Sequence, residues 1–122
     1  MDQLKQLKQL RHLAGVKRDV DVAQLERLKV QLRAVEMQID RLEQAAVETD
    51  PDPEQPSPFK YSGRDALWDA WRLSRIRELA QKSARIRADI EQQTVKARRS
   101  VGKHQVIGKL VERKAPAVPQ AW

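Results

Sequence analysis

The side chains best suited to catalysis or metal binding are sparse in this sequence, and the two histidines come first among them. His12 and His104 lie far apart along the chain, so they can meet only if the chain folds back on itself. No cysteine and no dense group of carboxylates accompanies them, and two histidines alone would bind a metal ion weakly. We therefore expect no metal site, and we expect His104 to be a packed or partly solvated side chain.

The carboxylates and glycines also fail to form a catalytic pattern. The acidic pairs Asp19/Asp21 and Asp50/Asp52 lie in charged sequence, where the environment that tunes an acid–base pair is not expected. The glycines of the second half stand alone instead of forming a phosphate-binding loop. Because the chain has no cysteine, it has no thiolate nucleophile and no cysteine-based zinc site. The sequence therefore predicts a protein that is not an enzyme and uses no cofactor.

Positive charge is concentrated in the second half of the chain. Residues 1–48 hold 9 basic and 8 acidic side chains, residues 49–58 hold 0 and 3, and residues 59–122 hold 15 and 6, which gives a net charge of +7. The asymmetry favours an acidic protein surface or a nucleic acid as partner, and a merely solvated face is the alternative. Nucleic acid is disfavoured because no aromatic residues are interleaved for base stacking. The basic stripe consists of Arg75, Lys82, Arg85, Lys96, Arg99, Lys103 and Arg113.

Length and composition restrict the class of protein. The 122 residues are 40% hydrophobic, 34% charged and only 4% aromatic, which leaves too few aromatics for a wide core and too much aliphatic content for general disorder. No run of about 18 apolar residues is present, so no transmembrane helix is expected. Residues 1–5 lack an uncharged apolar stretch, so we expect no signal peptide and a cytoplasmic protein.

A long helix is predicted over residues 1–49. This segment contains no proline and a single glycine, and its apolar heptads predict a narrow seam against another helix. Towards the N-terminus the same frame meets Asp21, Arg18 and Arg11, which we interpret as a local stutter or a looser contact. The predicted seam residues are Leu25, Leu28, Leu32, Val35, Ile39, Leu42 and Ala46.

An acidic, proline-rich turn over residues 50–61 separates this helix from a second one. Four prolines in the nine residues 50–58 remove backbone donors and disfavour helical geometry. The second helix is predicted over residues 62–114, with Ser62 as its N-cap, and residues 115–122 are predicted to form a flexible tail. Its seam is expected at Leu73, Ile76, Ala80, Ser83, Arg87, Ile90, Thr94, Ala97 and Val101.

Each helix has one apolar seam and therefore needs a helical partner. A hairpin within one chain and a dimer both satisfy this need, and the prolines at mid-chain between arms of similar length favour the hairpin. The fold class is therefore predicted to be all-α, with two long helices forming an antiparallel coiled-coil hairpin.

Both ends of the chain carry more apolar residues than a two-helix seam requires. Leucine recurs at every third position near the N-terminus, which spreads these side chains over about half of the helix surface. In a hairpin both groups share one tip, and they indicate either a third helix or fraying ends, or an apolar surface for another protein. The two groups are Leu4, Leu7, Leu10 and Leu13, and Val106, Ile107, Leu110 and Val111.

Four of the aromatic residues lie close to the predicted turn. Trp68 and Trp71 are three residues apart and are expected on one helical face. The group predicts either a small local core against the end of the first helix or a docking patch for a partner. Its members are Phe59, Tyr61, Trp68 and Trp71.

Short patterns in both helices resemble those of a known family. They lie at residues 10–21 and 23–25 of the first helix and at residues 96–99 and 109–113 of the second, whose ending is basic. Together with the two-helix plan, they resemble the flagellar export protein FliJ and its YscO-type injectisome counterparts, a family of type III secretion stalk proteins.

This resemblance implies a coiled-coil stalk or adaptor that is not an enzyme. The paired terminal helices would enter the ring of a hexameric export ATPase, and the hairpin would contact the export gate protein and export chaperones. The protein would be cytoplasmic and peripherally associated with the inner membrane export apparatus through these partners. The inserted end would hold Leu4, Leu7, Leu10, Val106, Ile107 and Leu110, with Arg98, Arg99, Lys103 and Lys109 as electrostatic contacts.

Two other functions stay open at this point. One is a homodimeric coiled-coil scaffold or adaptor, and the other is a basic helical hairpin that binds nucleic acid. The sequence does not distinguish a flagellar from an injectisome system, a monomer from a dimer, or the tip that meets each partner, and it does not identify a cargo or chaperone.

Overall fold

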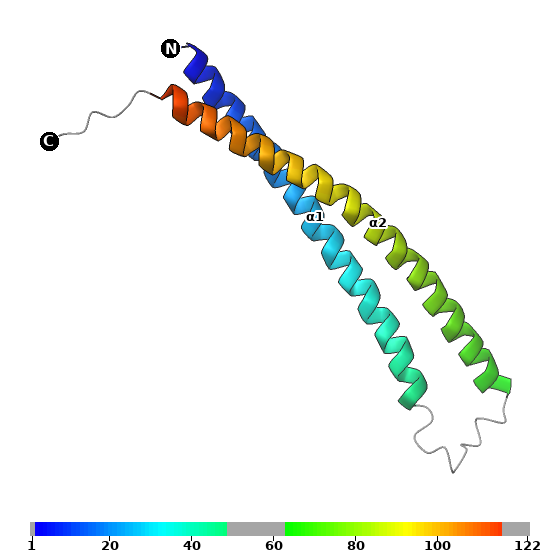
Figure 1. Ribbon diagram of the computed structural model, residues 1–122. Coiled ribbons are helices and arrows are strands. Elements are labelled where there is room, and N and C mark those ends of the chain that lie inside the picture. The colour runs from blue at the N-terminus through cyan, green and yellow to red at the C-terminus, as the bar shows by residue number, and fades with distance from the viewer. Residues whose placement is uncertain (1, 49–62, 116–122) are drawn as a thin grey trace. The chain divides into compact units, whose positions relative to one another are not determined.

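The chain forms two long α-helices, as the heptad pattern predicts (Figure 1). The computed structural model describes residues 2–48 and 63–115. Helix α1 spans Asp2–Glu48 and helix α2 spans Gly63–Lys114. The described residues contain no strand, so the all-α fold class with two long, mutually packed helices is confirmed. The predicted turn at 50–61, the N-cap Ser62 and the tail from residue 116 onward lie outside the described residues.

The composition of the two helices explains why they form. Neither helix contains a proline, the residue that most strongly breaks helices. Asp2 and Asp65 lie in the first turns, and Arg113 and Lys114 lie in the last turn of α2, where their charges complement the helix dipole. After α2, the backbone N–H of Ala115 still donates to the carbonyl of Val111 at 2.9 Å.

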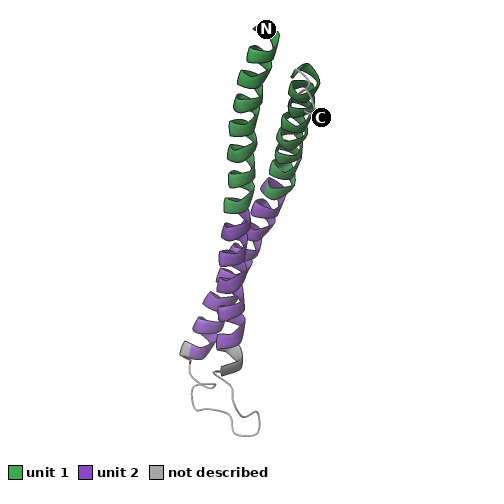
Figure 2. Ribbon diagram, turned by 90° about the vertical axis from the view of Figure 1, so that its left-hand side faces the viewer, with its two compact units in different colours: residues 1–27, 90–122 green, residues 28–89 purple. Residues whose placement is uncertain are grey.

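Two compact units divide the structure, and each unit contains part of both helices (Figure 2). Unit 1 comprises residues 1–27 and 90–122, and unit 2 comprises residues 28–89. Within each unit the segments of α1 and α2 run antiparallel and bury a seam between them.

Unit 2 confirms the predicted seam of α1. Leu28 and Val35 are buried, and three further apolar residues of the same frame are half-buried, while the side chain of Ala46 lies outside the described part of the structure. Burying one such side chain stabilises the fold by about 1.5–3 kcal/mol, so a few heptads suffice to hold two helices together. The half-buried members are Leu32, Ile39 and Leu42.

The seam of α2 in unit 2 differs from the predicted one at every second position. Ile76 and Ser83 lie in the seam as expected, but Leu79 and Ile86 are buried in place of Ala80 and Arg87, which are exposed. Leu73, also predicted in the seam, is exposed as well. The two frames share Ile76 and Ser83, which are seven residues apart. The observed frame buries more apolar surface because it contains Leu79 and Ile86 in place of Ala80 and Arg87.

Arg87 lies outside the seam and forms an ion pair across the two helices of unit 2. Its Nη2 lies 2.9 Å from Oε1 of Glu36, and the side chains of Arg87 and Glu36 are 64% and 42% exposed. An exposed pair of this kind contributes at most about 1 kcal/mol. The pair therefore supports the helix register without supplying much of the stability.

In unit 1 the seam of α1 continues without the predicted stutter. Asp21 is buried, and Arg18, Ala14 and Arg11 are half-buried in the same heptad frame. The interpretation of this segment as a stutter or loose contact is therefore wrong. The frame holds at Asp21 and Arg18 because Ser100 and His104 on α2 are hydrogen-bonded to them.

The observed register of α2 makes a direct prediction about stability. Leu79 is 2% exposed and Leu73 is 53% exposed, so Leu79→Ala should lower the free energy of unfolding by about 2–4 kcal/mol. Leu73→Ala should lower it by less than about 0.5 kcal/mol. Urea unfolding followed by helical circular dichroism measures both variants, and equal losses would contradict the register.

Candidate functional site

A buried polar cluster lies in unit 1 around Asp21. The hydroxyl of Ser100 on α2 donates a hydrogen bond to the Asp21 carboxylate, and Lys17 Nζ lies 3.4 Å from the second carboxylate oxygen. Gln93 on α2 donates to the backbone carbonyl of Asp21 at 2.8 Å. The cluster thus satisfies an acidic side chain that occupies a seam position, because a buried carboxylate without such partners would destabilise the fold.

The environment of Asp21 lowers the pKa of its carboxyl group below the usual value of 3.8. The hydrogen bond from Ser100 is the largest cause; burial acts in the opposite direction. The charges of Lys17 and Lys96 lower the pKa further because they favour the carboxylate. The lowered pKa favours the carboxylate form of Asp21, which Ser100 and Lys17 engage.

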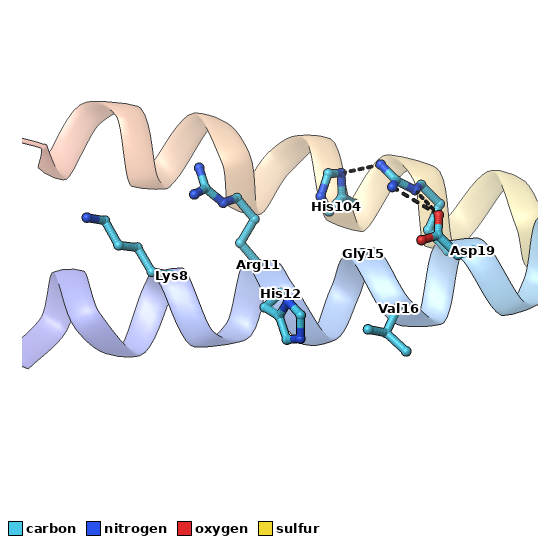
Figure 3. A pocket seen from close by; sticks show the side chains of 8 residues that line it. Lys8, Arg11, His12, Gly15, Val16, Asp19 and His104 are labelled. Carbon is cyan, nitrogen blue, oxygen red and sulfur yellow. Dashed lines mark hydrogen bonds and ion pairs between the residues drawn. The ribbon is translucent and has the colours of Figure 1, made fainter.

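A second polar contact joins α1 and α2 nearer the N-terminus (Figure 3). A guanidinium N–H of Arg18 donates to Nδ1 of His104 at 3.1 Å, while Arg18 also bonds Asp19 at 3.0 Å. The imidazole of His104 packs on Gly15, lying 3.4 Å from where a Cβ would stand. A Cβ at this position would stand at the near limit of ordinary van der Waals contact with the ring.

The two histidines do not form a site together. His104 bonds Arg18, whereas His12 is exposed, although both rings border the same groove of about 350 Å³. Within the described residues, no group of three or more histidine, cysteine or acidic side chains is placed to hold a metal ion.

A basic groove runs between the two helices of unit 1. It has a volume of about 440 Å³, and five of its lining side chains are cationic while one, Asp21, is acidic. Val20 and Ser100 also line it. Since the Asp21 carboxylate is bound within the seam, the groove presents positive charge outward. The cationic residues are Lys17, Arg27, Lys96, Arg99 and Lys103.

All of the net charge of the chain belongs to unit 1. Its residues 1–27 and 90–122 include 13 basic and 6 acidic side chains, whereas unit 2 includes 11 of each. Thus unit 1 carries +7 and unit 2 is neutral. Counting charges separately in the two halves of the sequence does not show this division, because each unit contains segments of both helices.

An apolar hollow adjoins the basic groove on α2. It has a volume of about 420 Å³ and is lined by Gly102, Val106 and Ile107 together with Arg99 and Lys103. The last two residues also line the basic groove, so the two features share a wall. Unit 1 therefore offers positive charge and apolar surface side by side.

The residues predicted for the inserted end divide into two groups. Leu4, Leu7 and Ile107 are half-buried, in the seam frame. Leu10, Val106 and Leu110 are 40–58% exposed. Leu13 is 63% exposed as well, so these side chains are accessible to a partner.

The predicted electrostatic contacts also divide into two groups. All four, Arg98, Arg99, Lys103 and Lys109, are exposed, but only Arg99 and Lys103 line the basic groove. The groove residues on α1, Lys17 and Arg27, are absent from the sequence-based site. The nearly balanced charge of the first helix concealed them, and an antiparallel register would have revealed them.

The predicted aromatic patch lies in unit 2 and is only partly described. Trp68 is half-buried, and the guanidinium of Arg72 lies 5.8 Å from its ring centre, within range of a cation–π interaction. Trp71 is 57% exposed, so a shared local core is wrong for this residue. Leu67, four residues before Trp71, is also exposed. Phe59 and Tyr61 lie outside the described residues.

Acid should weaken unit 1 through Asp21. Because the pKa of Asp21 is lowered in the folded state, the carboxylate stabilises the fold above about pH 3.8, and this contribution is lost as the pH falls through the lowered value. Asp21→Asn should therefore be less stable than the original protein at neutral pH, and the difference should shrink in acid. Urea unfolding across this pH range tests the expectation, with the exposed Asp19→Asn as the charge control. A difference that does not change with pH would contradict it.

Comparison with known proteins gives no match to this chain, whether to a family model, a curated protein or a solved structure. Among the described residues, neither helix contains a stretch long and apolar enough to cross a membrane.

Proposed function

We propose that this protein is a coiled-coil stalk or adaptor of a type III protein export ATPase and is not an enzyme. In this proposal unit 1 enters the ATPase ring, and the remainder of the chain contacts the export gate or export chaperones. The protein is then cytoplasmic and associates with the inner membrane export apparatus through its partners.

One observation carries the proposal: unit 1 combines the whole net charge of the chain with exposed apolar side chains. The unit is built from the first part of α1 and the last part of α2, which are the paired terminal segments that a stalk inserts. Its exposed leucines and valines would be a liability on a protein without a partner. A ring that encloses this unit would cover them and would meet its positive charge with acidic side chains.

The proposal predicts an effect of this protein on the cognate ATPase. Adding the protein should promote hexamer formation and raise ATP turnover, as measured by sedimentation and by phosphate release. The double variant Leu10→Asp/Val106→Asp should need about tenfold more protein for the same effect, because it places charge on the exposed apolar surface. Leu73→Asp, an exposed residue of unit 2, is the matched control. Unchanged turnover at saturating protein would contradict the proposal.

A homodimeric scaffold is the second candidate, and a specific feature of α1 favours it. Leu13, Val16 and Val20 are all about half-exposed or more, and their spacing of three and four residues places them on one face of the helix. A second copy could cover this face. A stable dimer in analytical sedimentation that Val16→Asp dissociates would favour the scaffold over the stalk.

A further inference from the structure

We propose that the basic groove and the adjoining apolar hollow together bind one acidic, amphipathic helix of a partner protein. This inference rests on the proposed function, because it names the chemistry of the partner segment that unit 1 accepts. It goes further in assigning that segment to one side of the unit and in predicting its residue pattern.

The cations of α2 form a row that matches a helical ligand. Lys96, Arg99 and Lys103 follow one another at intervals of three and four residues, so they share one face over about 10 Å of helix. Arg99 and Lys103 form no ion pair with any described residue. Lys17 and Arg27 add positive charge from α1. Carboxylates spaced by three and four residues on a partner helix would meet this row.

The apolar hollow supplies the second half of the match. Val106, Ile107 and Gly102 line it, and Arg99 and Lys103 join it to the basic groove. A helix that places carboxylates over the groove would therefore place its neighbouring apolar side chains over the hollow. A phosphate or another small anion would use only the groove and would leave the hollow uncovered.

Gly102 provides an independent reason to expect that a partner helix approaches α2 closely at the apolar hollow. Apart from its chain neighbours and the adjacent backbone of its own helix, no atom of the protein lies within 4 Å of the position that a Cβ would occupy there, so the fold itself has no steric need for glycine. Glycine in a helix interior costs about 1 kcal/mol relative to alanine. The absence of a side chain instead leaves room for the backbone of another helix at the floor of the hollow.

Protein is favoured over nucleic acid as the occupant. None of the residues that line the groove and the hollow is aromatic, so bases would find no stacking platform. The apolar lining beside the cations favours aliphatic side chains, which an amphipathic helix supplies.

Binding of a designed peptide tests the inference without any ATPase. The probe is a fluorescent helical peptide of about 20 residues, long enough to be helical when alone, with leucines on one face and glutamates on its flanks. Its anisotropy is titrated with the full chain. Control probes replace the glutamates by glutamine or the leucines by serine, and a DNA duplex serves as a further arm. The acidic peptide should bind at least about tenfold more tightly than each control probe.

Charge-reversal variants test where on the surface of unit 1 the peptide binds. Lys96→Glu/Arg99→Glu should weaken binding of the acidic peptide by about tenfold or more. Lys5→Glu/Lys8→Glu removes the same amount of positive charge at exposed residues of α1 that line neither the basic groove nor the apolar hollow, and it should change binding by less than about twofold. Equal losses in both variants would show attraction to net charge alone and would overturn the inference, as would tighter binding of the DNA duplex.

Alanine variants of Gly102 and Gly108 on α2 distinguish an effect on peptide binding from an effect on stability. Gly102→Ala and Gly108→Ala should both raise the melting temperature, because each removes a helix-destabilising glycine and the added methyl group meets nothing within 4 Å. Only Gly102→Ala should weaken peptide binding, since Gly108 does not line the hollow. Binding that is unchanged in Gly102→Ala would overturn the assignment of the partner helix to this side.

Failure of this inference and failure of the proposed function give different results. If the peptide does not bind but the chain still stimulates the ATPase, the groove assignment is wrong and the stalk function stands. If the peptide binds as expected and the ATPase does not respond, unit 1 accepts an acidic helix from a different protein.

Discussion

The hydrogen bond between Ser100 and the buried carboxylate of Asp21 is the contact on which the arrangement of unit 1 depends. A charged group at a seam position is tolerated only when the opposite helix supplies its partner, so this pair specifies which turn of α2 lies beside which turn of α1. The bond from Arg18 to His104 repeats the same constraint one turn away. Apolar side chains alone tolerate a shift by one heptad, whereas these two polar pairs do not. The basic groove exists because this register brings Lys17 level with Lys103.

The sequence predicted the fold class and most of the α1 seam because leucine and valine at heptad spacing leave few alternatives. It predicted the α2 seam only in part. Ile90, Thr94, Ala97 and Val101 are buried or half-buried as predicted, but in unit 2 the shared residues Ile76 and Ser83 are compatible with two frames, and the observed one takes Leu79 and Ile86 in place of Ala80 and Arg87. Choosing between them requires knowing which residues the opposite helix covers. The polar part of the seam was misread for a related reason: Asp21 and Arg18 look like interruptions until their partners on α2 are known.

The candidate site was only partly accessible from the sequence. Arg99, Lys103, Val106 and Leu110 were identified from excess charge and excess apolar content near one end of the chain. Lys17 and Arg27 were not, because charges on the first helix nearly cancel in the sequence, while the folded unit separates those that face the groove from those that do not. Local composition therefore located one wall of the groove, and tertiary pairing was needed for the other.

The division of charge between the units has a kinetic consequence. A neutral unit 2 exerts little long-range force, whereas the field of a unit carrying +7 extends about one Debye length, roughly 8 Å in physiological salt. As the chain diffuses near an acidic target, attraction acts on one part of the molecule and turns that part toward the target before contact. Unit 1 is thus oriented toward the target during the encounter itself, before any contact is made.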